Sequence, residues 1–134
     1  MTAVYSQIQK VVPEDLDELR HVNNIRYLQW IQDLSRKHWE AVVDPALRSS
    51  LVWVVRSHHI TYHRAAILGD SIHMATHVER FQGPISERVV EMTLAKTGEP
   101  LVSAQTQWCL LDAGSLRPKR VPEAIIKLFT EIEK

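Results

Sequence analysis

Hydrophobic residues recur at helical spacing over residues 23–43. They are Ile25, Leu28, Ile31, Leu34, Trp39, Val42 and Val43, with Tyr27 and Trp30 flanking the stripe. Spacings of three and four residues place side chains on one face of a helix, and this face is broad. We predict a helix here that is largely enclosed. It should stop before Asp44-Pro45, because a residue that precedes proline disfavours the helical region.

Most of the remaining chain has the pattern of β-strands, with β-branched and aromatic residues and stretches of strict alternation. Gly-Asp, Gly-Pro and Thr-Gly-Glu-Pro sequences separate the later strands and predict turns. An amphipathic stripe after Pro122, which fits a first helical position, predicts a short C-terminal helix. The predicted strands are residues 4–12, 53–66, 71–81, 86–96 and 101–111.

The order of these elements is strand, long helix, four strands and short helix. Four strands with short connections are expected to pair as an antiparallel meander, and their sheet must cover the long helix. The predicted fold class is therefore α+β, with a five-stranded antiparallel sheet wrapped around a long central helix. At 134 residues we expect a single domain over residues 1–134.

Composition narrows the choice of partners. The 16 Lys and Arg residues balance 16 Asp and Glu residues, so neither a nucleic acid nor an anionic membrane is indicated. The single cysteine, Cys109, excludes an internal disulfide and favours a reducing compartment. Residues 1–10 have no signal-peptide pattern, and no apolar run is long enough to cross a bilayer. We expect a cytoplasmic protein.

Polar and titratable residues gather where the long helix should begin, in the run DLDELRHVNN at residues 15–24. The first N–H groups of a helix lack partners, and they can polarise a carbonyl that becomes an oxyanion. Asp17 is close enough to act there as a general base or nucleophile, and His21 could orient it. Asp15, Asp17 and Asn23 also suit turns and helix caps. These residues alone leave both interpretations open.

The spacing D-x-D-x-x-x-H-V-N-N-x-x-Y resembles a signature of the hotdog thioesterases. It is carried here by Asp15, Asp17, His21, Val22, Asn23, Asn24 and Tyr27. These enzymes include acyl-CoA thioesterases related to hydroxybenzoyl-CoA thioesterase, and the acyl-ACP thioesterases. ITYHRAAILGDSI (60–72) and LRPKRVPEAI (116–125) are similar to two later segments of the family, in the expected order. The resemblance implies a single hotdog domain.

The resemblance also implies roles for individual residues. Asp17 matches the catalytic carboxylate, and the amide N–H of Asn24 matches the donor that polarises the thioester carbonyl. His21 and Asn23 match positions that shape the loop and assist catalysis in some members. The active site should lie between subunits of a homodimer or a dimer of dimers. No cofactor is expected beyond the coenzyme A of the substrate.

Four residues depart from the family pattern. Arg20 stands where many members have glycine, so the loop conformation is expected to differ, or Arg20 to reach a substrate phosphate. Leu19 stands where acyl-ACP enzymes carry Asn, and Ala65-Ala66 occupies the region of their helper Glu. Those enzymes also usually fuse two hotdog units. An acyl-CoA substrate is therefore favoured.

Further residues are candidates for substrate binding. Arg56 and His58 should share a strand face with Tyr62 and could line a groove for coenzyme A between subunits. Basic side chains could contact the phosphates of coenzyme A, but exposed Lys and Arg residues are also explained by solubility. Aromatic side chains such as Tyr27 could border the acyl group, but they are also explained by core packing. The candidates are Arg20, Tyr27, Arg56, His58, Tyr62, Arg64, Arg117, Lys119 and Arg120.

Two other functions stay open, namely an acyl-thioester hydratase or dehydratase and a non-catalytic acyl-CoA binding module. Histidine pairs also raise the question of a metal site. His59 with His63, and His73 with His77, each share a strand face, and a turn near residue 68 could bring the two pairs together. No acidic or cysteine ligand pattern accompanies these histidines, so no metal is expected.

Overall fold

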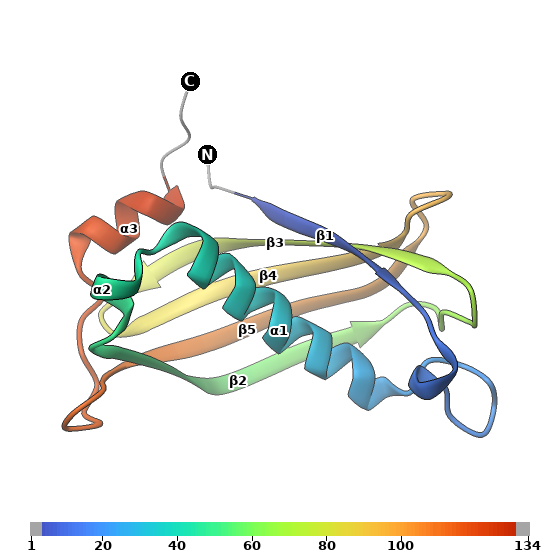
Figure 1. Ribbon diagram of the computed structural model, residues 1–134, viewed down its shortest axis with the longest axis horizontal. Helices are drawn as coiled ribbons and strands as arrows, with labels where there is room; N and C mark the ends of the chain where they lie inside the picture. The colour runs from blue at the N-terminus through green and yellow to red at the C-terminus, as the bar shows by residue number, and fades with distance from the viewer. Residues whose placement is uncertain (1–3, 131–134) are drawn as a thin grey trace.

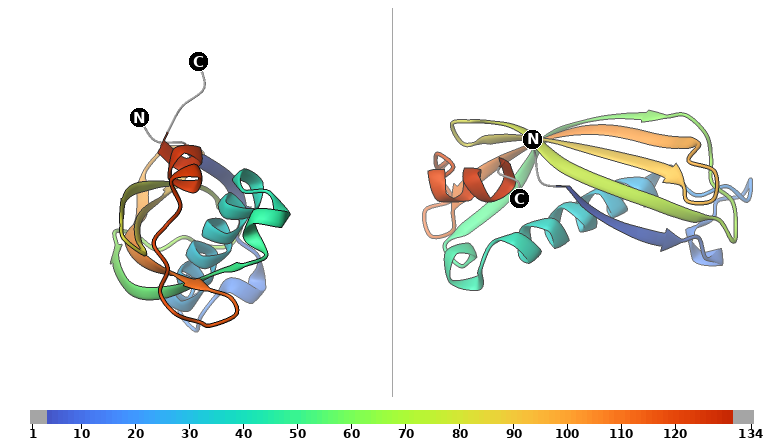
Figure 2. Two further views of the ribbon diagram at one scale, coloured as in Figure 1. Left: turned by 90° about the vertical axis from the view of Figure 1, so that its left-hand side faces the viewer. Right: turned by 90° about the horizontal axis from the view of Figure 1, so that it is seen from above.

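The computed structural model describes residues 4–130 as a curved antiparallel sheet with one long helix in its concave face (Figures 1 and 2). The predicted α+β architecture is confirmed. The strands are β1 (Tyr5–Lys10), β2 (Leu51–Tyr62), β3 (Ser71–Gln82), β4 (Ile85–Leu94) and β5 (Pro100–Asp112). The helices are α1 (Asn24–Val42), α2 (Pro45–Arg48) and α3 (Glu123–Thr130), with a 3-10 turn over Pro13–Asp15.

The strand order is β1-β3-β4-β5-β2, and every neighbouring pair is antiparallel. β3, β4 and β5 form a meander, as predicted. β2 does not pair with β3. It pairs with β5, from Leu51 opposite Asp112 to Tyr62 opposite Val102. The prediction that all four strands pair in sequence order is therefore wrong, and β2 forms an edge of the sheet.

The reason lies in residues 63–70, which connect β2 to β3. This segment is no tight turn, because it crosses the end of the sheet. The N–H of His63 donates to a carbonyl of β5 (2.8 Å), and the N–H of Gly69 donates to the carbonyl of Val11, just after β1 (3.3 Å). β2 and β3 are thus separated by the width of the two intervening strands.

Alternation along the strands determines which side chains face α1. On β3, Ile72, Met74 and Val78 are at most 2 % exposed, as the pattern predicts. The same holds on β5 for Val102 and Ala104. The concave face of the sheet is therefore the apolar face, and it packs against α1.

The bounds of α1 agree with the prediction. Asn23 is its N-cap, and its Oδ1 accepts from the N–H of Ile25 (3.0 Å). After the helix, Asp44 caps α2. The buried face of α1 is narrower than predicted, because Ile25 is 63 % exposed. α3 begins at Glu123, one residue later than predicted. None of the helices described in residues 4–130 combines the length and hydropathy needed to cross a membrane.

The interior contains two apolar clusters along α1. Tyr27, Ile31 and Leu34 belong to the first cluster, which surrounds the N-terminal half of the helix. The second cluster includes Leu110 of β5 and Phe129 of α3. The N-terminal half of α1 is therefore fixed by close packing, and the polar run of residues 15–24 leads directly into it.

Candidate active site

Asp17 fixes the loop that precedes α1. Its N–H donates to the carbonyl of His21 (2.8 Å), and the N–H of Arg20 donates to its carbonyl (3.0 Å). Its carboxylate Oδ1 accepts from the N–H groups of Leu19 (2.9 Å) and His21 (3.2 Å). Within residues 4–130, the other oxygen, Oδ2, accepts no hydrogen bond. Oδ1 of Asp17 therefore holds the loop in place, and Oδ2 is free to act as a base or nucleophile.

Asp15 has a different role. It is 5 % exposed, and both of its carboxylate oxygens are used. Oδ2 accepts from the N–H of Val12 (2.9 Å), and Oδ1 pairs with Nε of Arg26 on α1 (2.9 Å). Asp15 is thus a structural residue that joins the 3-10 turn to the helix.

Arg20 has a left-handed backbone conformation, with φ of 62°. Glycine adopts this conformation without steric cost, whereas a residue with a Cβ atom is strained by about 1–2 kcal/mol. The backbone at position 20 therefore has a conformation that glycine adopts more easily, although the residue is arginine. The Arg20 side chain is exposed and forms no ion pair with any carboxylate in residues 4–130.

The segment after β2 holds the loop against the sheet. His21 and Ile67 form an isolated antiparallel bridge, and the N–H of Val22 donates to the carbonyl of Ala66 (2.9 Å). The N–H of Ala66 in turn donates to the hydroxyl of Tyr27 (3.0 Å). Tyr27 is 1 % exposed, and burial raises the pKa of its hydroxyl. Its hydroxyl therefore positions residue 66 from within the core.

The first N–H of α1 remains open. Asn23 satisfies the N–H of Ile25 with its side chain, and its carbonyl accepts from Arg26 (2.8 Å). The N–H of Asn24 has no acceptor in the part of the chain that the structure describes. It lies at the positive end of the α1 dipole, where a carbonyl oxygen or an anion is stabilised.

The imidazole of His21 forms no hydrogen bond to Asp17 within residues 4–130. Only the backbone N–H of His21 reaches that carboxylate. His21 contributes to the Asp17 geometry through its main chain, and its side chain is exposed.

Large apolar side chains are exposed on the segments that meet at this loop. Leu19 and Ile25 are 74 % and 63 % exposed, and Ile67 and Leu68 are 50 % and 54 % exposed. Neighbouring exposed apolar side chains are typical of a ligand or subunit contact. The loop therefore combines a free carboxylate oxygen, an open helix N–H and an apolar surround.

The other candidate residues lie in three places. Arg64 is at the same end as Asp17, exposed and paired with Glu99. The ring of Tyr62 lies 5.8 Å from that of Tyr27. His58 faces inward, and its Nδ1 is 2.8 Å from Oγ1 of Thr106 on β5.

Arg56 does not share the face of His58, contrary to the prediction. A bulge between Val55 and Ser57 takes Arg56 out of the ladder and leaves it exposed. The extra residue shifts the alternation by one position, so Val55 faces inward in its place. Arg56 and His58 therefore cannot line one groove.

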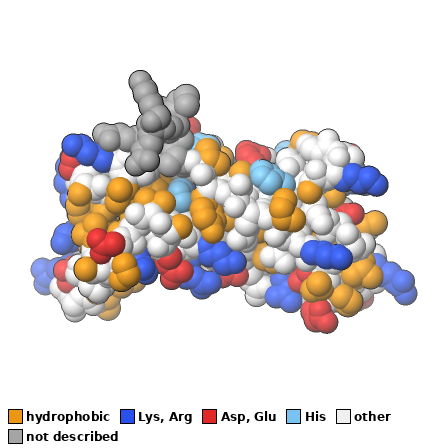
Figure 3. Space-filling view, turned by 45° about the horizontal axis from the view of Figure 1, so that its top comes forward, with side chains coloured by type: hydrophobic (Ala, Val, Ile, Leu, Met, Phe, Trp, Pro, Cys, Tyr) orange, Lys and Arg blue, Asp and Glu red, His pale blue; other side chains and the backbone are white. Residues whose placement is uncertain are grey.

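Arg117, Lys119 and Arg120 lie at the far end of β5, beside the bridge between Leu111 and Pro118. The Asp17 loop is at the opposite end of the molecule (Figure 1). One chain therefore does not bring this basic run to Asp17. On the face drawn in Figure 3, Lys and Arg side chains are interspersed with Asp and Glu and form no extended basic surface.

The two histidine pairs are not brought together. β2 and β3 are not neighbours, and His63 instead contacts Oγ of Ser103 on β5 (2.9 Å). The turn near residue 68, expected to join the pairs, belongs to the segment that crosses the sheet. In the described range, no group of three His, Cys, Asp or Glu side chains could hold a metal ion.

One inward-facing cation was not singled out from the sequence. Arg88 on β4 is 6 % exposed. The alternation of Ser86, Arg88, Val90 and Met92 is the signal that could have placed it on the inner face, since all four are buried.

A sequence profile described as the thioesterase-like superfamily matches residues 11–129. No curated protein matches the chain. Among solved structures, the chain is similar to Slr0204, a 1,4-dihydroxy-2-naphthoyl-CoA thioesterase from Synechocystis, with a TM-score of 0.82 and 13 % identity over 94 % of this chain and 95 % of that one.

It is also similar to a thioesterase from Thermus thermophilus complexed with coenzyme A and Zn, with a TM-score of 0.80 and 23 % identity over 92 % of this chain and 90 % of that one. For the 12:0-ACP thioesterase of Umbellularia californica the TM-score is 0.83, with 17 % identity over 96 % of this chain but only 51 % of that one. These similarities confirm the predicted hotdog fold.

Proposed function

Because the chain belongs to the thioesterase-like superfamily, we propose that it hydrolyses acyl-CoA thioesters to a free acid and coenzyme A. Membership confirms the family that the sequence resembles and supports thioester hydrolysis as the reaction. An acyl-CoA substrate is supported by the departures at Leu19 and Ala65-Ala66 and by the coenzyme A named with two similar structures. The observation that carries the proposal is a free carboxylate oxygen on Asp17 in the loop that leads to an open helix N–H.

In the proposed reaction, the thioester carbonyl oxygen accepts a hydrogen bond from the N–H of Asn24, aided by the α1 dipole. Oδ2 of Asp17 removes a proton from a water molecule whose oxygen attacks the carbonyl carbon, or Oδ2 attacks that carbon itself. The tetrahedral oxyanion stays on the Asn24 N–H. Its collapse breaks the C–S bond, and the coenzyme A sulfur takes a proton. After attack by water, the acyl group leaves directly as the acid. After attack by Oδ2, the acyl group stays on Asp17 as a mixed anhydride, and a water molecule hydrolyses it to the acid and free Asp17.

The loop geometry supports Asp17 in this role. Oδ1 is held by two backbone N–H groups, so the carboxylate is oriented before substrate binds. A preoriented group loses less freedom in the reaction than a mobile one. Asn23 supports the site by capping α1, which leaves the N–H of Asn24 as the open donor.

A second copy of the chain would complete this site. Arg117, Lys119 and Arg120 are far from Asp17 in one chain, yet a nucleotide with several phosphates favours basic neighbours. β2 is 12 residues long and lies at the edge of the sheet. Antiparallel pairing of two β2 edges about a two-fold axis would put the Asp17 end of one copy beside the basic run of the other. We therefore expect a homodimer or a dimer of dimers.

Thiol release from a panel of short, long and aromatic acyl-CoAs tests the reaction. Asp17→Asn should lower kcat/KM by ~10²–10⁴-fold, the usual contribution of a general base. Glu18→Gln is the matched control, because Glu18 lies in the same loop, is exposed and forms no hydrogen bond or ion pair within residues 4–130. Full activity in Asp17→Asn, or hydrated thioester without free thiol, would contradict the proposal.

Subunit complementation tests the shared site. Asp17→Asn and a double variant, Lys119→Ala with Arg120→Ala, should each be impaired. Unfolding and refolding the two together yields hybrid dimers with one site that has both Asp17 and the basic run intact. Activity should then exceed that of either variant alone. A fully active monomer in sedimentation equilibrium would contradict the arrangement.

A further inference from the structure

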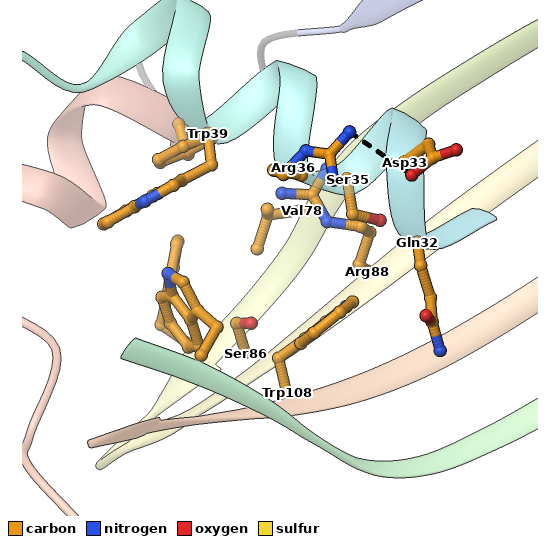
Figure 4. Close-up of a pocket in the computed structure, with 12 residues that line it drawn as sticks. Gln32, Asp33, Ser35, Arg36, Trp39, Val78, Ser86, Arg88 and Trp108 are labelled. Carbon is orange, nitrogen blue, oxygen red and sulfur yellow. Dashed lines mark ion pairs between the residues drawn. The ribbon is translucent and has the colours of Figure 1, made fainter. Parts of the chain in front are cut away.

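Arg88 is a buried cation without a buried counter-charge. It projects from β4 into the space between the sheet and α1 (Figure 4). Its Nη1 lies 2.9 Å from Nδ1 of His38 on α1, and it donates to Oγ1 of Thr76 on β3 (3.1 Å). Both partners are neutral groups. No carboxylate in residues 4–130 forms an ion pair with Arg88.

The charges of the two central groups follow from their burial. Burial lowers the pKa of Arg88 to about 10, so the guanidinium stays protonated near neutral pH. Burial, the charge of Arg88 and then His77 lower the pKa of His38 to about 4. His38 is therefore neutral, and its Nδ1 accepts a hydrogen bond from Nη1 of Arg88. A buried cation with only neutral partners is unfavourable for folding alone.

A cavity of about 320 Å³ lies beside Arg88. This volume falls within the range of small-molecule sites, about 300–1,000 Å³. Its walls are mainly apolar, and Ser35 and Ser86 also line it. The apolar lining residues are Trp39, Trp53, Val78, Phe81, Trp108 and Phe129. Figure 4 shows Arg88 near Ser35 under α1, with Trp39 and Trp108 on the walls.

Among the charged residues that line this cavity, Arg88 is the one without an ion-pair partner in residues 4–130. The other charged lining residues, Asp33 and Arg36, pair with each other at 3.3 Å. Nε and Nη2 of Arg88 have no acceptor in the described residues. The indole Nε1 of Trp108 is fully buried and also has no acceptor in that part of the chain. Gln32 also lines the cavity. A buried cation without an ion-pair partner and an indole N–H without an acceptor favour an anionic ligand.

We propose that this cavity binds the carboxylate of an apolar acid, with the acid group on Arg88 and the hydrocarbon body among the aromatic walls. A planar guanidinium matches a carboxylate in shape and charge. The donors left free on Arg88 are those that a carboxylate would use. The aromatic walls would shelter an alkyl or aromatic body from water.

The acid is a free one and not the distal end of an acyl group bound at Asn24 of the same chain. At ~1.5 Å per residue, α1 separates Asn24 from Ser35 by roughly 16 Å. The fully buried side chains of Tyr27, Ile31 and Leu34 fill the interior between these positions. The cavity is therefore a second site, and the proposal does not depend on thioester hydrolysis.

Intrinsic fluorescence tests the proposal directly, because Trp39, Trp53 and Trp108 line the cavity and the chain has only 4 tryptophans. Sodium octanoate should change the emission saturably. 1-Octanol, which has the same chain without the charge, should bind at least ~10-fold more weakly, the factor expected when a charged hydrogen bond is lost. Equal affinity for the two, or no saturable change with octanoate, would overturn the proposal.

Arg88→Met removes the cation and keeps an unbranched side chain. It should weaken octanoate binding at least ~10-fold, whereas Lys37→Met, an exposed charge loss on α1, and Asp17→Asn should bind octanoate as the natural chain does. Unchanged binding in Arg88→Met would overturn the assignment. If Arg88→Met does not fold, the comparison of octanoate with octanol in the natural chain still decides the matter.

A second titration separates a free acid from a substrate. The coenzyme A monothioester of suberic acid carries a distal carboxylate, and octanoyl-CoA does not. Both are titrated into Asp17→Asn, so no turnover is involved. If the suberyl thioester binds in an Arg88-dependent way and octanoate does not bind, the free-acid proposal is overturned and the cavity is assigned to an acyl group.

Discussion

Removing the Tyr27 hydroxyl tests how the core holds the candidate active site. In Tyr27→Phe, the N–H of Ala66 loses its acceptor at 3.0 Å. Ala66 is fully buried and Tyr27 is 1 % exposed, so water cannot easily replace that acceptor. An unsatisfied buried donor costs about 1–3 kcal/mol. The free energy of unfolding should fall by that amount.

Urea denaturation at constant pH measures this change, and an unchanged slope with denaturant would show that the unfolded state is not altered. Tyr62→Phe is the matched control. Its ring lies beside that of Tyr27 but is 43 % exposed, and its hydroxyl has no partner in the described residues. We expect Tyr62→Phe to stay within about 0.5 kcal/mol of the natural chain.

The same variant separates a core role from substrate contact. Ala66 also accepts from the N–H of Val22, so a shift of residue 66 should move the loop and lower kcat. If the Tyr27 hydroxyl touched substrate directly, KM would rise without any loss of stability. Tyr27→Phe with unchanged stability would refute the structural reasoning.

Two further predictions concern His38 and Arg20. The pKa of His38 is about 4 in the folded chain against 6.5 ordinarily, so the unfolded state binds more protons between these values. Stability should therefore be fully present above pH 6.5 and fall by up to ~3 kcal/mol toward pH 4. His38→Gln keeps an acceptor for Arg88 but does not titrate, and urea denaturation should show a shallower fall; an identical pH profile would contradict this. Arg20→Gly should change stability by no more than about 1 kcal/mol, because relief of the left-handed strain at φ of 62° is offset by a freer unfolded chain. If Arg20 binds a phosphate, KM should rise for acyl-CoA and not for acyl-pantetheine, and equal KM changes would exclude that role.

Sequence pattern predicts which face of a strand is buried better than it predicts strand neighbours. The alternation of Ile72, Met74 and Val78 placed the inner face of β3 correctly, because the period of a strand depends on local geometry. The partner of β2 depends on the path of residues 63–70, which hydrogen-bonds across the end of the sheet. Period-2 alternation carries no information about that path, so the expected meander was only partly right.

The candidate site shows a similar limit. Asp15 and Asp17 are both acidic and belong to one motif, and their sequence context does not separate a structural from a reactive carboxylate. Three-dimensional contacts do. Asp15 uses both oxygens on Val12 and Arg26, whereas Asp17 uses only one. The motif therefore predicts where the candidate site lies, and the hydrogen bonds show which carboxylate is fully engaged in the structure and which has a free oxygen.

For Arg88, the sequence pattern predicts which face of the sheet it lies on but not which groups surround it. Its place between Ser86 and Val90 on an alternating strand puts it on the inner face. Whether it has a counter-charge there depends on α1 and β3, which contribute His38 and Thr76. Only the assembled fold reveals that both partners are neutral.

The two halves of α1 face different environments, and this difference makes the two sites separable. Around Tyr27 and Ile31 the core is filled, which suits a site that must hold a reacting group in a fixed geometry. Around Ser35 and Arg88 the packing is incomplete, and a polar cation lines the space. Close packing leaves no room for a ligand in the interior around Tyr27 and Ile31, so a substrate at the Asn24 N–H must approach from the surface, whereas the cavity admits a ligand beneath α1. Substitutions near the N-terminus of α1 should therefore change turnover and leave octanoate binding intact, and substitution of Arg88 should do the reverse.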